Sequence, residues 1–295
     1  LRIRFIFFQN CLKDPQEKYK DLKFRKKLNK KAFRGFNMDC TLTSIHYCPV
    51  KSLSFQSIKS CNIKKNLGMP NDRIFAFSRG VDLKKAKLIE KNPNERKLNN
   101  FLTLKNSPVL NKYNFIYNKD KLTLAFQEKE LISISPENPE ERSLLSDKLL
   151  ELESSLIKPI SLLKNNDFPF YDTSHSNNVF NSMSLINLNS IKDFEKKINE
   201  KVEFQRFRGN FYVHGIEAWE ERNWINKIIK INNISFKVEK NISRCVAINL
   251  KPKTDNVVTN LLKSLKKSYN HFNMGIYLTA LENGKIGLGS KIELN

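Results

Sequence analysis

The sequence has few of the residues that mark the specialised protein classes. Its 295 residues include only 5 Cys, 9 Gly and 10 Pro. These low counts exclude a disulfide-stapled scaffold, a collagen-like repeat and a Gly/Pro-rich low-complexity chain. No apolar run approaches the roughly 18–20 residues that a helix needs to cross a bilayer, so we expect no membrane span. Because an odd number of cysteines leaves at least one free thiol, we predict a reducing, cytoplasmic setting.

Several catalytic motifs are missing as well. The chain has no G-x-x-x-x-G-K-[ST] loop, no G-x-S-x-G elbow, no H-E-x-x-H and no Cys-x-x-Cys pair. The four histidines stand singly at positions 46, 175, 214 and 271. We therefore expect neither a nucleotide-binding P-loop nor a zinc site made by protein ligands alone.

Positive charge and aromatic residues are abundant. The formal net charge is +22, from 52 Lys and Arg against 30 Asp and Glu, and 21 Phe, 8 Tyr and 2 Trp are available for a core. That aromatic content excludes a disordered chain. The charge suggests a polyanion partner, but Lys outnumbers Arg, 40 to 12, and Arg is the better reader of phosphates and bases. Nucleic-acid binding is therefore our third hypothesis, and we expect no nucleic-acid partner.

The first 37 residues differ in composition from the rest. They hold 12 basic and 3 acidic side chains and start at Leu1. A secretory signal would need a longer apolar region and a cleavage site, and the acidic residues argue against a mitochondrial presequence. We interpret residues 1–37 as a basic head that is either a tail or not native to the folded protein. The alternative is a basic arm that binds an acidic surface.

From Met38 onward, alternating apolar residues and turn signals predict many short strands and few helices. Strands are expected at residues 41–47, 73–78, 114–117, 122–126, 130–134, 211–213, 228–231, 235–238, 245–250, 275–281 and 285–288. Helices are expected after a cap at Asn138, after a cap at Ser190, and near residues 257–269. The fold class is thus α+β and rich in strands, with a β-barrel domain at 38–135 and a larger domain at 136–295.

Three local segments could carry chemistry. The first is Tyr47-Cys48-Pro49-Val50-Lys51-Ser52, the second is the Gly68–Arg73 turn, and the third is Arg206-Phe207-Arg208-Gly209-Asn210, followed later by Ser243-Arg244-Cys245. Taken singly, each has an ordinary interpretation as a solvated turn, a surface ion pair or a small buried cysteine.

Taken together and in this order, the segments resemble the MOSC family, the molybdenum cofactor sulfurase C-terminal domain superfamily. Cys48–Ser52 is similar to its "Y-P-[VI]-K-S" element, Gly68–Arg73 to "G-L-x-x-D-R", Phe207–Asn210 to "F-R-P-N" and Ser243–Cys245 to the end of "C-S-R-C". The segment from Met274 to Ser290 resembles the family's "F-G-x-Y…G-x-I-x-V-G-D" ending. The resemblance covers residues 40 to 295 and implies an N-terminal β-barrel domain followed by a MOSC-type β-barrel domain with peripheral helices.

The resemblance also implies a cofactor and the residues that hold it. It implies a molybdenum–molybdopterin cofactor (Moco), with Cys245 as the metal ligand and catalytic residue. A thiolate is a soft ligand that suits such a metal. The cofactor-binding residues carried over are Lys51, Ser52, Arg73, Arg208, Asn210, Ser243 and Tyr277. Ile242 and Gly209 depart from the family pattern at a Cys and a Pro, and we expect Cys48 to be structural.

Our leading hypothesis is a molybdenum-dependent oxidoreductase that reduces N-hydroxylated or N-oxide small molecules. No ferredoxin-type cysteine cluster is present, so we expect a separate electron-transfer protein of ferredoxin or cytochrome b5 type, together with its reductase. The alternative is a non-catalytic cofactor carrier or a sulfur-handling protein with a persulfide on Cys245. The family is also associated with pyridoxal phosphate, whose chemistry would require a Schiff-base lysine domain that we do not find.

Overall fold

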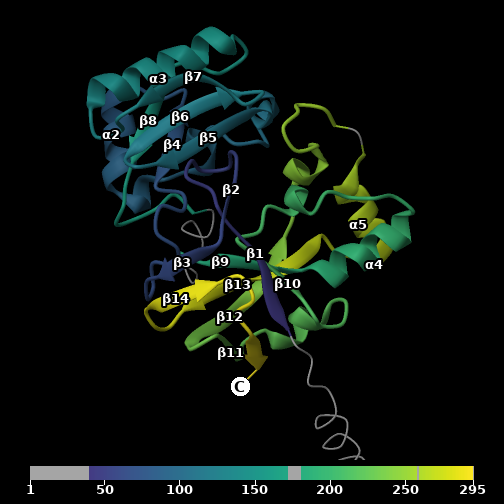
Figure 1. Cartoon of the computed structure of the whole chain (residues 1–295). Coiled ribbons are helices and arrows are strands. Elements are labelled where there is room, and N and C mark those ends of the chain that lie inside the picture. Colours follow the sequence, from purple (N-terminus) through teal and green to yellow (C-terminus); the bar gives the residue numbers. More distant parts are fainter. Residues whose placement is uncertain (1–39, 172–180, 258, 295) are drawn as a thin grey trace, which may run out of the picture. The chain divides into compact units, whose positions relative to one another are not determined.

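The computed structural model describes residues 40–171, 181–257 and 259–294 (Figure 1). The predicted head at residues 1–37 lies outside them. The described chain is mixed α+β and rich in strands, with four α-helices, which confirms the predicted fold class at that level. Closure of the strands into two barrels and the domain boundary at 135/136 stay predictions.

The largest sheet joins strands from both ends of the described chain. Its order is β15-β11-β12-β13-β9-β10-β1-β2. Its strands are β1 (Thr41–Tyr47), β2 (Gln56–Ile58), β9 (Met183–Asn187), β10 (Phe211–His214), β11 (Ile228–Ile231), β12 (Ile234–Ser243), β13 (Asn273–Ala280) and β15 (Ile292–Leu294). β1 pairs antiparallel with β10, so a strand from the start of the predicted N-terminal domain belongs to the sheet of the C-terminal half.

Backbone hydrogen bonds join the chain at the last strand, β15, to the chain at the first strand, β1. Leu42 N donates to Ser290 O at 2.9 Å, and Ile292 N donates to Cys40 O at 2.8 Å. Beside this contact, β14 (Gly284–Gly287) pairs antiparallel with β3 (Ser60–Ile63). Residues 40–63 and 284–294 are thus fixed to each other.

A second group of strands lies between β3 and β9 in the sequence. β4 (Phe75–Arg79) pairs with β8 (Ile160–Lys164), and β5 (Tyr113–Asn118), β6 (Lys121–Phe126) and β7 (Lys129–Ile134) form a three-stranded meander. The predicted hairpin at Asn118–Lys121 is confirmed. Both of its central residues, Lys119 and Asp120, have positive φ, as a tight turn between twisted strands requires.

The helices start at side-chain caps. They are α2 (Leu83–Lys91), α3 (Pro139–Leu152), α4 (Leu188–Ile198) and α5 (Leu261–Tyr269). Asn138 caps α3 as predicted, since its side chain accepts a hydrogen bond from the backbone of Glu140. The side chains of Asp82, Asn187 and Asn260 cap the other three helices.

Two expectations about these elements were wrong. Ser190 does not cap α4, because its hydroxyl donates a hydrogen bond to the buried carboxylate of Glu221. No strand covers residues 245–250. Instead, β12 ends at Ser243 and Cys245 precedes a 3-10 turn, Val246–Asn249. This turn moves the cysteine from a buried strand to an exposed corner.

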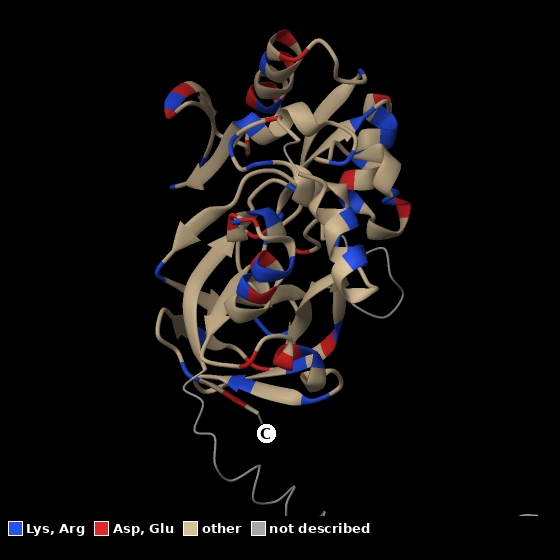
Figure 2. Cartoon of the chain, turned by 90° about the vertical axis from the view of Figure 1, so that its right-hand side faces the viewer, with Lys and Arg blue, Asp and Glu red and all other residues tan. Residues whose placement is uncertain are grey.

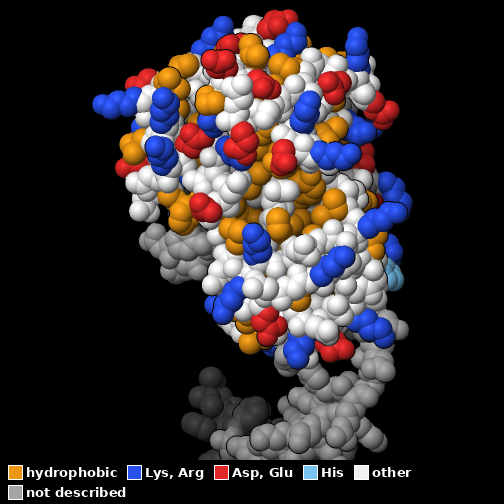
Figure 3. All heavy atoms as spheres, turned by 60° about the vertical axis from the view of Figure 1, so that its left-hand side comes forward, with side chains coloured by type: hydrophobic (Ala, Val, Ile, Leu, Met, Phe, Trp, Pro, Cys, Tyr) orange, Lys and Arg blue, Asp and Glu red, His pale blue; other side chains and the backbone are white. Residues whose placement is uncertain are grey.

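Basic residues do not form a continuous stripe in Figures 2 and 3. Along the helices, basic and acidic residues are interspersed (Figure 2). On the face shown in Figure 3, hydrophobic side chains gather across the middle, with charged side chains of both signs above them. In these two views, Lys and Arg are mixed with acidic residues and do not gather in one basic patch.

Gly275 gives a test of how tightly β13 packs on β9. It has φ +80°, and a Cβ placed there would lie 2.4 Å from the carbonyl oxygen of Leu185. We expect Gly275→Ala to lower the free energy of unfolding by about 3 kcal/mol or more, from backbone strain and this clash. Urea denaturation measures the loss.

Gly289 is the matched control for that substitution. It has nearly the same φ, +81°, but a Cβ there would meet nothing within 4 Å. Gly289→Ala should cost about 1 kcal/mol, from the backbone alone. Equal losses in the two variants would contradict the close packing of β13 on β9.

His46 on β1 predicts a pH dependence of stability. Its ring lies edge-on to Tyr212 and Phe204, and burial lowers its pKa below the ordinary 6.5. The folded protein therefore prefers the neutral ring. The resulting stability is present above the unfolded pKa and is lost as the pH falls through the lowered folded pKa. We expect the free energy of unfolding to decrease as the pH falls below about 6.5.

Replacing His46 tests its share of this dependence. His46→Gln should flatten the slope in part, since burial and Arg222 also lower the pKa of His271. His214→Gln, at an exposed position, should keep the wild-type slope. Urea titrations between pH 5 and pH 7 make the comparison, and an unchanged slope in His46→Gln would refute the role of His46.

Candidate functional site

A pocket of about 520 Å³ brings together most of the site residues predicted from the sequence. Six of the eight line it: Ser52, Arg73, Arg208, Ser243, Cys245 and Tyr277. These residues lie far apart in the sequence: Tyr277 is within β13, Ser243 ends β12, and the others lie on connections between strands. The two others, Lys51 and Asn210, are buried and are not among the lining residues.

Cys245 and Ser243 reach the pocket because β12 ends beside it. Arg244 between them is directed inward, where its Nε donates to Met274 O at 2.8 Å and its Nη1 to Phe207 O at 2.7 Å. Burial lowers the pKa of this guanidinium. Anchoring Arg244 fixes the backbone on either side and leaves Cys245 exposed, whereas Cys40, Cys48 and Cys61 are buried.

The segment Cys48–Leu53, which we call the floor, contributes one lining residue, Ser52, to the pocket. Val50 bridges Phe75 of β4 in parallel, Lys51 N donates to Phe75 O at 2.7 Å, and Arg73 N donates to Cys48 O at 2.6 Å. The Cys48 thiol is fully buried and donates to Val50 O at 2.9 Å. Burial also raises the pKa of this thiol, so Cys48 is held as a neutral part of the segment.

Asp72 connects this floor to the large sheet. Its carboxylate is fully buried and accepts hydrogen bonds from Cys48 N at 2.7 Å and from Asn210 Nδ2 at 3.0 Å. It also forms an ion pair with Arg73. One carboxylate thus joins the end of β1, the turn before β4 and the start of β10.

Asn210 and Lys51 make contacts within the protein. The Asn210 side-chain oxygen accepts from Ser184 N at 3.1 Å and Ser184 Oγ at 2.9 Å, and its amide donates to His46 O at 3.1 Å as well as to Asp72. Lys51 Nζ donates to Phe170 O at 2.9 Å. The structure gives both residues a positioning role behind the pocket, and a direct contact with a ligand stays a prediction.

Two guanidinium groups flank one aromatic ring at the pocket. Arg208 lies 4.9 Å and Arg73 lies 5.4 Å from the ring centroid of Phe55, and Arg208 also donates to Leu53 O at 2.6 Å. Sequence reasoning missed Phe55, because a single Phe between strands carries no functional signal. The ring holds two like charges close together through cation–π contact.

Three pocket residues have backbone conformations that non-glycine residues rarely adopt. Ser52, Arg73 and Arg208 have φ values of +62°, +58° and +52°. Left-handed non-glycine residues persist only where the surrounding contacts hold them, and they cluster at functional sites. Their meeting at one pocket supports its selection as the functional site.

Sequence reasoning also missed the outer wall of the pocket. This wall consists of Arg79 at the end of β4 and residues between 98 and 106: Leu98, Asn99, Thr103, Leu104, Lys105 and Asn106. The segment is fixed to β4, since Leu102 N donates to Phe77 O at 2.9 Å. No pattern in these residues predicts contact with residues more than 100 positions away.

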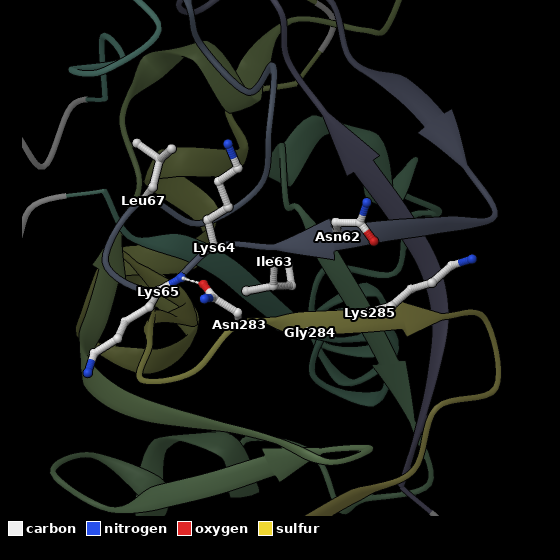
Figure 4. Close-up of a pocket in the computed structure, with 8 residues that line it drawn as sticks. All are labelled: Asn62, Ile63, Lys64, Lys65, Leu67, Asn283, Gly284 and Lys285. Atoms are coloured by element: carbon white, nitrogen blue, oxygen red, sulfur yellow. Dashed lines mark hydrogen bonds between the residues drawn. The ribbon is translucent and has the colours of Figure 1, made fainter.

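A second hollow, of about 690 Å³, lies at the pairing of β3 and β14. It is lined by Lys64, Lys65, Lys285, Asn283 and their neighbours, but its lysines diverge instead of meeting at one point (Figure 4). Asn283 Oδ1 accepts from Lys65 N at 2.8 Å and is used by the backbone. No cysteine or histidine lines this hollow, so the 520 Å³ pocket is the better candidate.

The donor set of the pocket fits a cofactor that brings its own metal and phosphate. Among the described residues, no group of three or more His, Cys, Asp or Glu side chains could hold a metal ion alone. The pocket offers one exposed thiol for a soft metal, two arginines for a phosphate, and the hydroxyls of Ser52, Ser243 and Tyr277.

Residues 172–293 match the family model of the MOSC domain. The chain therefore carries a MOSC domain over this range, as the sequence motifs predicted, and this domain family is associated with the molybdenum cofactor. The first nine residues of the match lie outside the described part, as does part of the Ser/Asn-rich stretch that begins at Thr173. A search of curated proteins found no significant match.

Three solved structures match with TM-scores below 0.5. YiiM from Geobacillus stearothermophilus has 15% identity and a TM-score of 0.32, over 38% of this chain and 53% of that chain. YuaD from Bacillus subtilis has 10% identity and a TM-score of 0.41, over 86% and 95%. YiiM from Escherichia coli has 16% identity and a TM-score of 0.29, over 38% and 53%. The chain covers about half the length of the two YiiM chains.

The described helices include none that is long and apolar enough to cross a membrane.

The buried Asp72–Arg73 pair yields a stability prediction. Asp72→Asn keeps the size of the side chain but leaves Arg73 facing a neutral amide. Breaking one side of a buried ion pair costs about 3 kcal/mol, and we expect a loss of that size in urea denaturation. Asp147→Asn on the exposed side of α3 is the matched control and should change stability by less than about 0.5 kcal/mol. A loss no larger than that of the control would show that Asp72 does not hold the site together.

Proposed function

We propose that the 520 Å³ pocket binds Moco and that the protein is a molybdenum-dependent oxidoreductase acting on N-hydroxylated or N-oxide compounds. The observation that carries the proposal is the position of Cys245. This exposed thiol shares one pocket with Arg73, Arg208 and Tyr277. The pocket volume is within the range of about 300–1,000 Å³ that is usual for small-molecule sites.

Each lining residue has a defined task in this proposal. The Cys245 thiolate is the protein ligand to molybdenum. Arg73 and Arg208, whose guanidinium groups both contact the Phe55 ring, bind the cofactor phosphate through charge-assisted hydrogen bonds. Ser52, Ser243 and Tyr277 hydrogen-bond the polar pterin, while Lys51 and Asn210 keep the floor and the sheet in register behind it.

The reaction follows from the chemistry of the N–O bond. When bound, the cofactor supplies two-electron redox chemistry and an open coordination position. In the net reaction the N–O bond breaks, two electrons and two protons are taken up, and water leaves. The pocket orients the substrate, and the backbone anchored by Arg244 holds the thiol in place. A separate electron-transfer protein of ferredoxin or cytochrome b5 type and its reductase supply the electrons, in the cytoplasm.

Metal analysis tests the cofactor assignment. Protein purified from a host that makes Moco should contain molybdenum, and Cys245→Ala should lose most of it, because the soft ligand is gone. Cys61→Ala removes a buried thiol outside the pocket lining and should keep the wild-type metal content. Absence of molybdenum from the wild type, or its retention in Cys245→Ala, would overturn the assignment.

Turnover separates the enzyme from the alternative function. The molybdenum-loaded protein should reduce benzamidoxime with dithionite-reduced methyl viologen as the electron source. Bound molybdenum without turnover would reject the proposed reaction. It would favour a cofactor carrier or a sulfur-handling protein with a persulfide on Cys245.

A further inference from the structure

The outer wall of the pocket carries two cations to which the proposed function gives no role. Arg79 is half-buried at the end of β4, and Lys105 is exposed in the segment after Leu98. Both line the pocket. Neither side chain forms a hydrogen bond or an ion pair with another residue of the described ranges. They differ in this respect from Arg73, Arg208 and Arg244, whose guanidinium groups contact protein groups.

The backbone fixes the position of this wall without using its charges. Arg79 pairs with Ile160 of β8 in the sheet register. Thr103 N donates to Asn106 Oδ1 at 2.9 Å, and Asn106 Nδ2 donates to Phe101 O at 2.9 Å, so a local turn holds Lys105. Partial burial removes the Arg79 guanidinium from some of its water, which costs free energy. No protein acceptor compensates this cost among the described residues, and an anionic ligand would offset it.

The pocket contains no negative charge of its own to fill this role. Its lining includes five basic residues and no Asp or Glu. Asp72 lies behind the floor, fully buried and bound to Arg73, and is not part of the lining. An anion beside Arg79 in this pocket therefore meets several positive side chains and no acidic lining residue.

We propose that Arg79 and Lys105 form an anion subsite that selects substrates bearing a carboxylate or phosphate group away from the reacting nitrogen. The guanidinium fork suits either group. The choice of an N-hydroxylated substrate rests on the proposed function, whereas the anion subsite itself does not. The preferred substrates are then anionic N-hydroxylated compounds, with the charged group at the outer wall and the N–O bond toward Cys245.

Alkylation of Cys245 tests the subsite without any cofactor. In the metal-free full chain, mass spectrometry gives the rates at which iodoacetate, an anion, and iodoacetamide, its neutral analogue, modify Cys245. The ratio of the two rates reports the local potential and cancels changes in the reactivity of the thiol. We expect Arg79→Gln to lower this ratio about two- to five-fold, and Lys105→Gln to lower it less, since Lys105 is exposed.

Lys84→Gln is the matched control for this measurement. Lys84 is an exposed lysine of α2 that does not line the pocket, and its loss should leave the ratio unchanged. An unchanged ratio in both Arg79→Gln and Lys105→Gln would overturn the subsite, as would an equal decrease in Lys84→Gln. If Arg79→Gln does not fold, as judged by thermal unfolding, Lys105→Gln and the salt dependence of the wild-type ratio decide.

Turnover then tests the substrate class. With the molybdenum-loaded protein, kcat/KM for 4-carboxybenzamidoxime should exceed that for benzamidoxime, and Arg79→Gln should reduce this ratio. A phosphate-bearing amidoxime in a third arm distinguishes the two anions. Loss of molybdenum in Arg79→Gln would assign Arg79 to the cofactor and overturn the subsite. No turnover of any compound would reject the proposed reaction, while the alkylation ratio would still report on the subsite.

Discussion

The buried carboxylate of Asp72 is the interaction on which the geometry of the site depends. It accepts hydrogen bonds from the end of β1 and from Asn210 beside β10, and it pairs with Arg73 in front of β4. A buried charge is costly unless each of its lone pairs has a partner. These partners come from three chain segments, so the contacts form only when folding has brought all three together. The position of the floor depends on these contacts.

The same contacts explain why residues with unusual backbone conformations gather here. Arg73 and Arg208 both have positive φ, and both of their guanidinium groups lie near the Phe55 ring. Such conformations cost of order 1–3 kcal/mol each. The bond from Arg208 to Leu53 O and the Asp72–Arg73 pair offset this cost. The unusual backbone conformations and the contacts that stabilise them therefore occur at the same place in the fold.

Much of the fold could be predicted from local sequence, and the family resemblance grouped six residues that line one pocket. The hairpin at Asn118–Lys121 and the cap at Asn138 depend on neighbouring residues, so their signals are visible in the chain. Six predicted residues share the pocket because ordered motifs carry information about long-range contacts that periodicity lacks. Whether they bind a cofactor stays a prediction.

What the sequence could not predict depended on distant partners. Ser190 has the chemistry of a cap, but Glu221 takes its hydroxyl, and no local rule anticipates that competition. Residues 245–250 are apolar enough for a strand, yet Arg244 turns inward to Met274 O and Phe207 O and ends β12. Arg79 and the segment from 98 to 106 line the same pocket as Cys245, and that segment is fixed to β4 by Leu102. These contacts appear only when the chain is folded.

The net charge of the chain does not indicate its ligand, whereas the positions of a few basic residues in the pocket indicate an anionic one. Basic residues are interspersed with acidic ones over the helices (Figure 2), and exposed charges farther apart than about 10 Å are screened by salt. In the pocket, partial burial reduces that screening, and the lining has no acidic residue. Arg73 shares its charge with Asp72, while Arg79 has no such partner among the described residues. The charge of Arg79 is therefore not neutralised by a carboxylate of the described residues, whereas that of Arg73 is partly neutralised by Asp72.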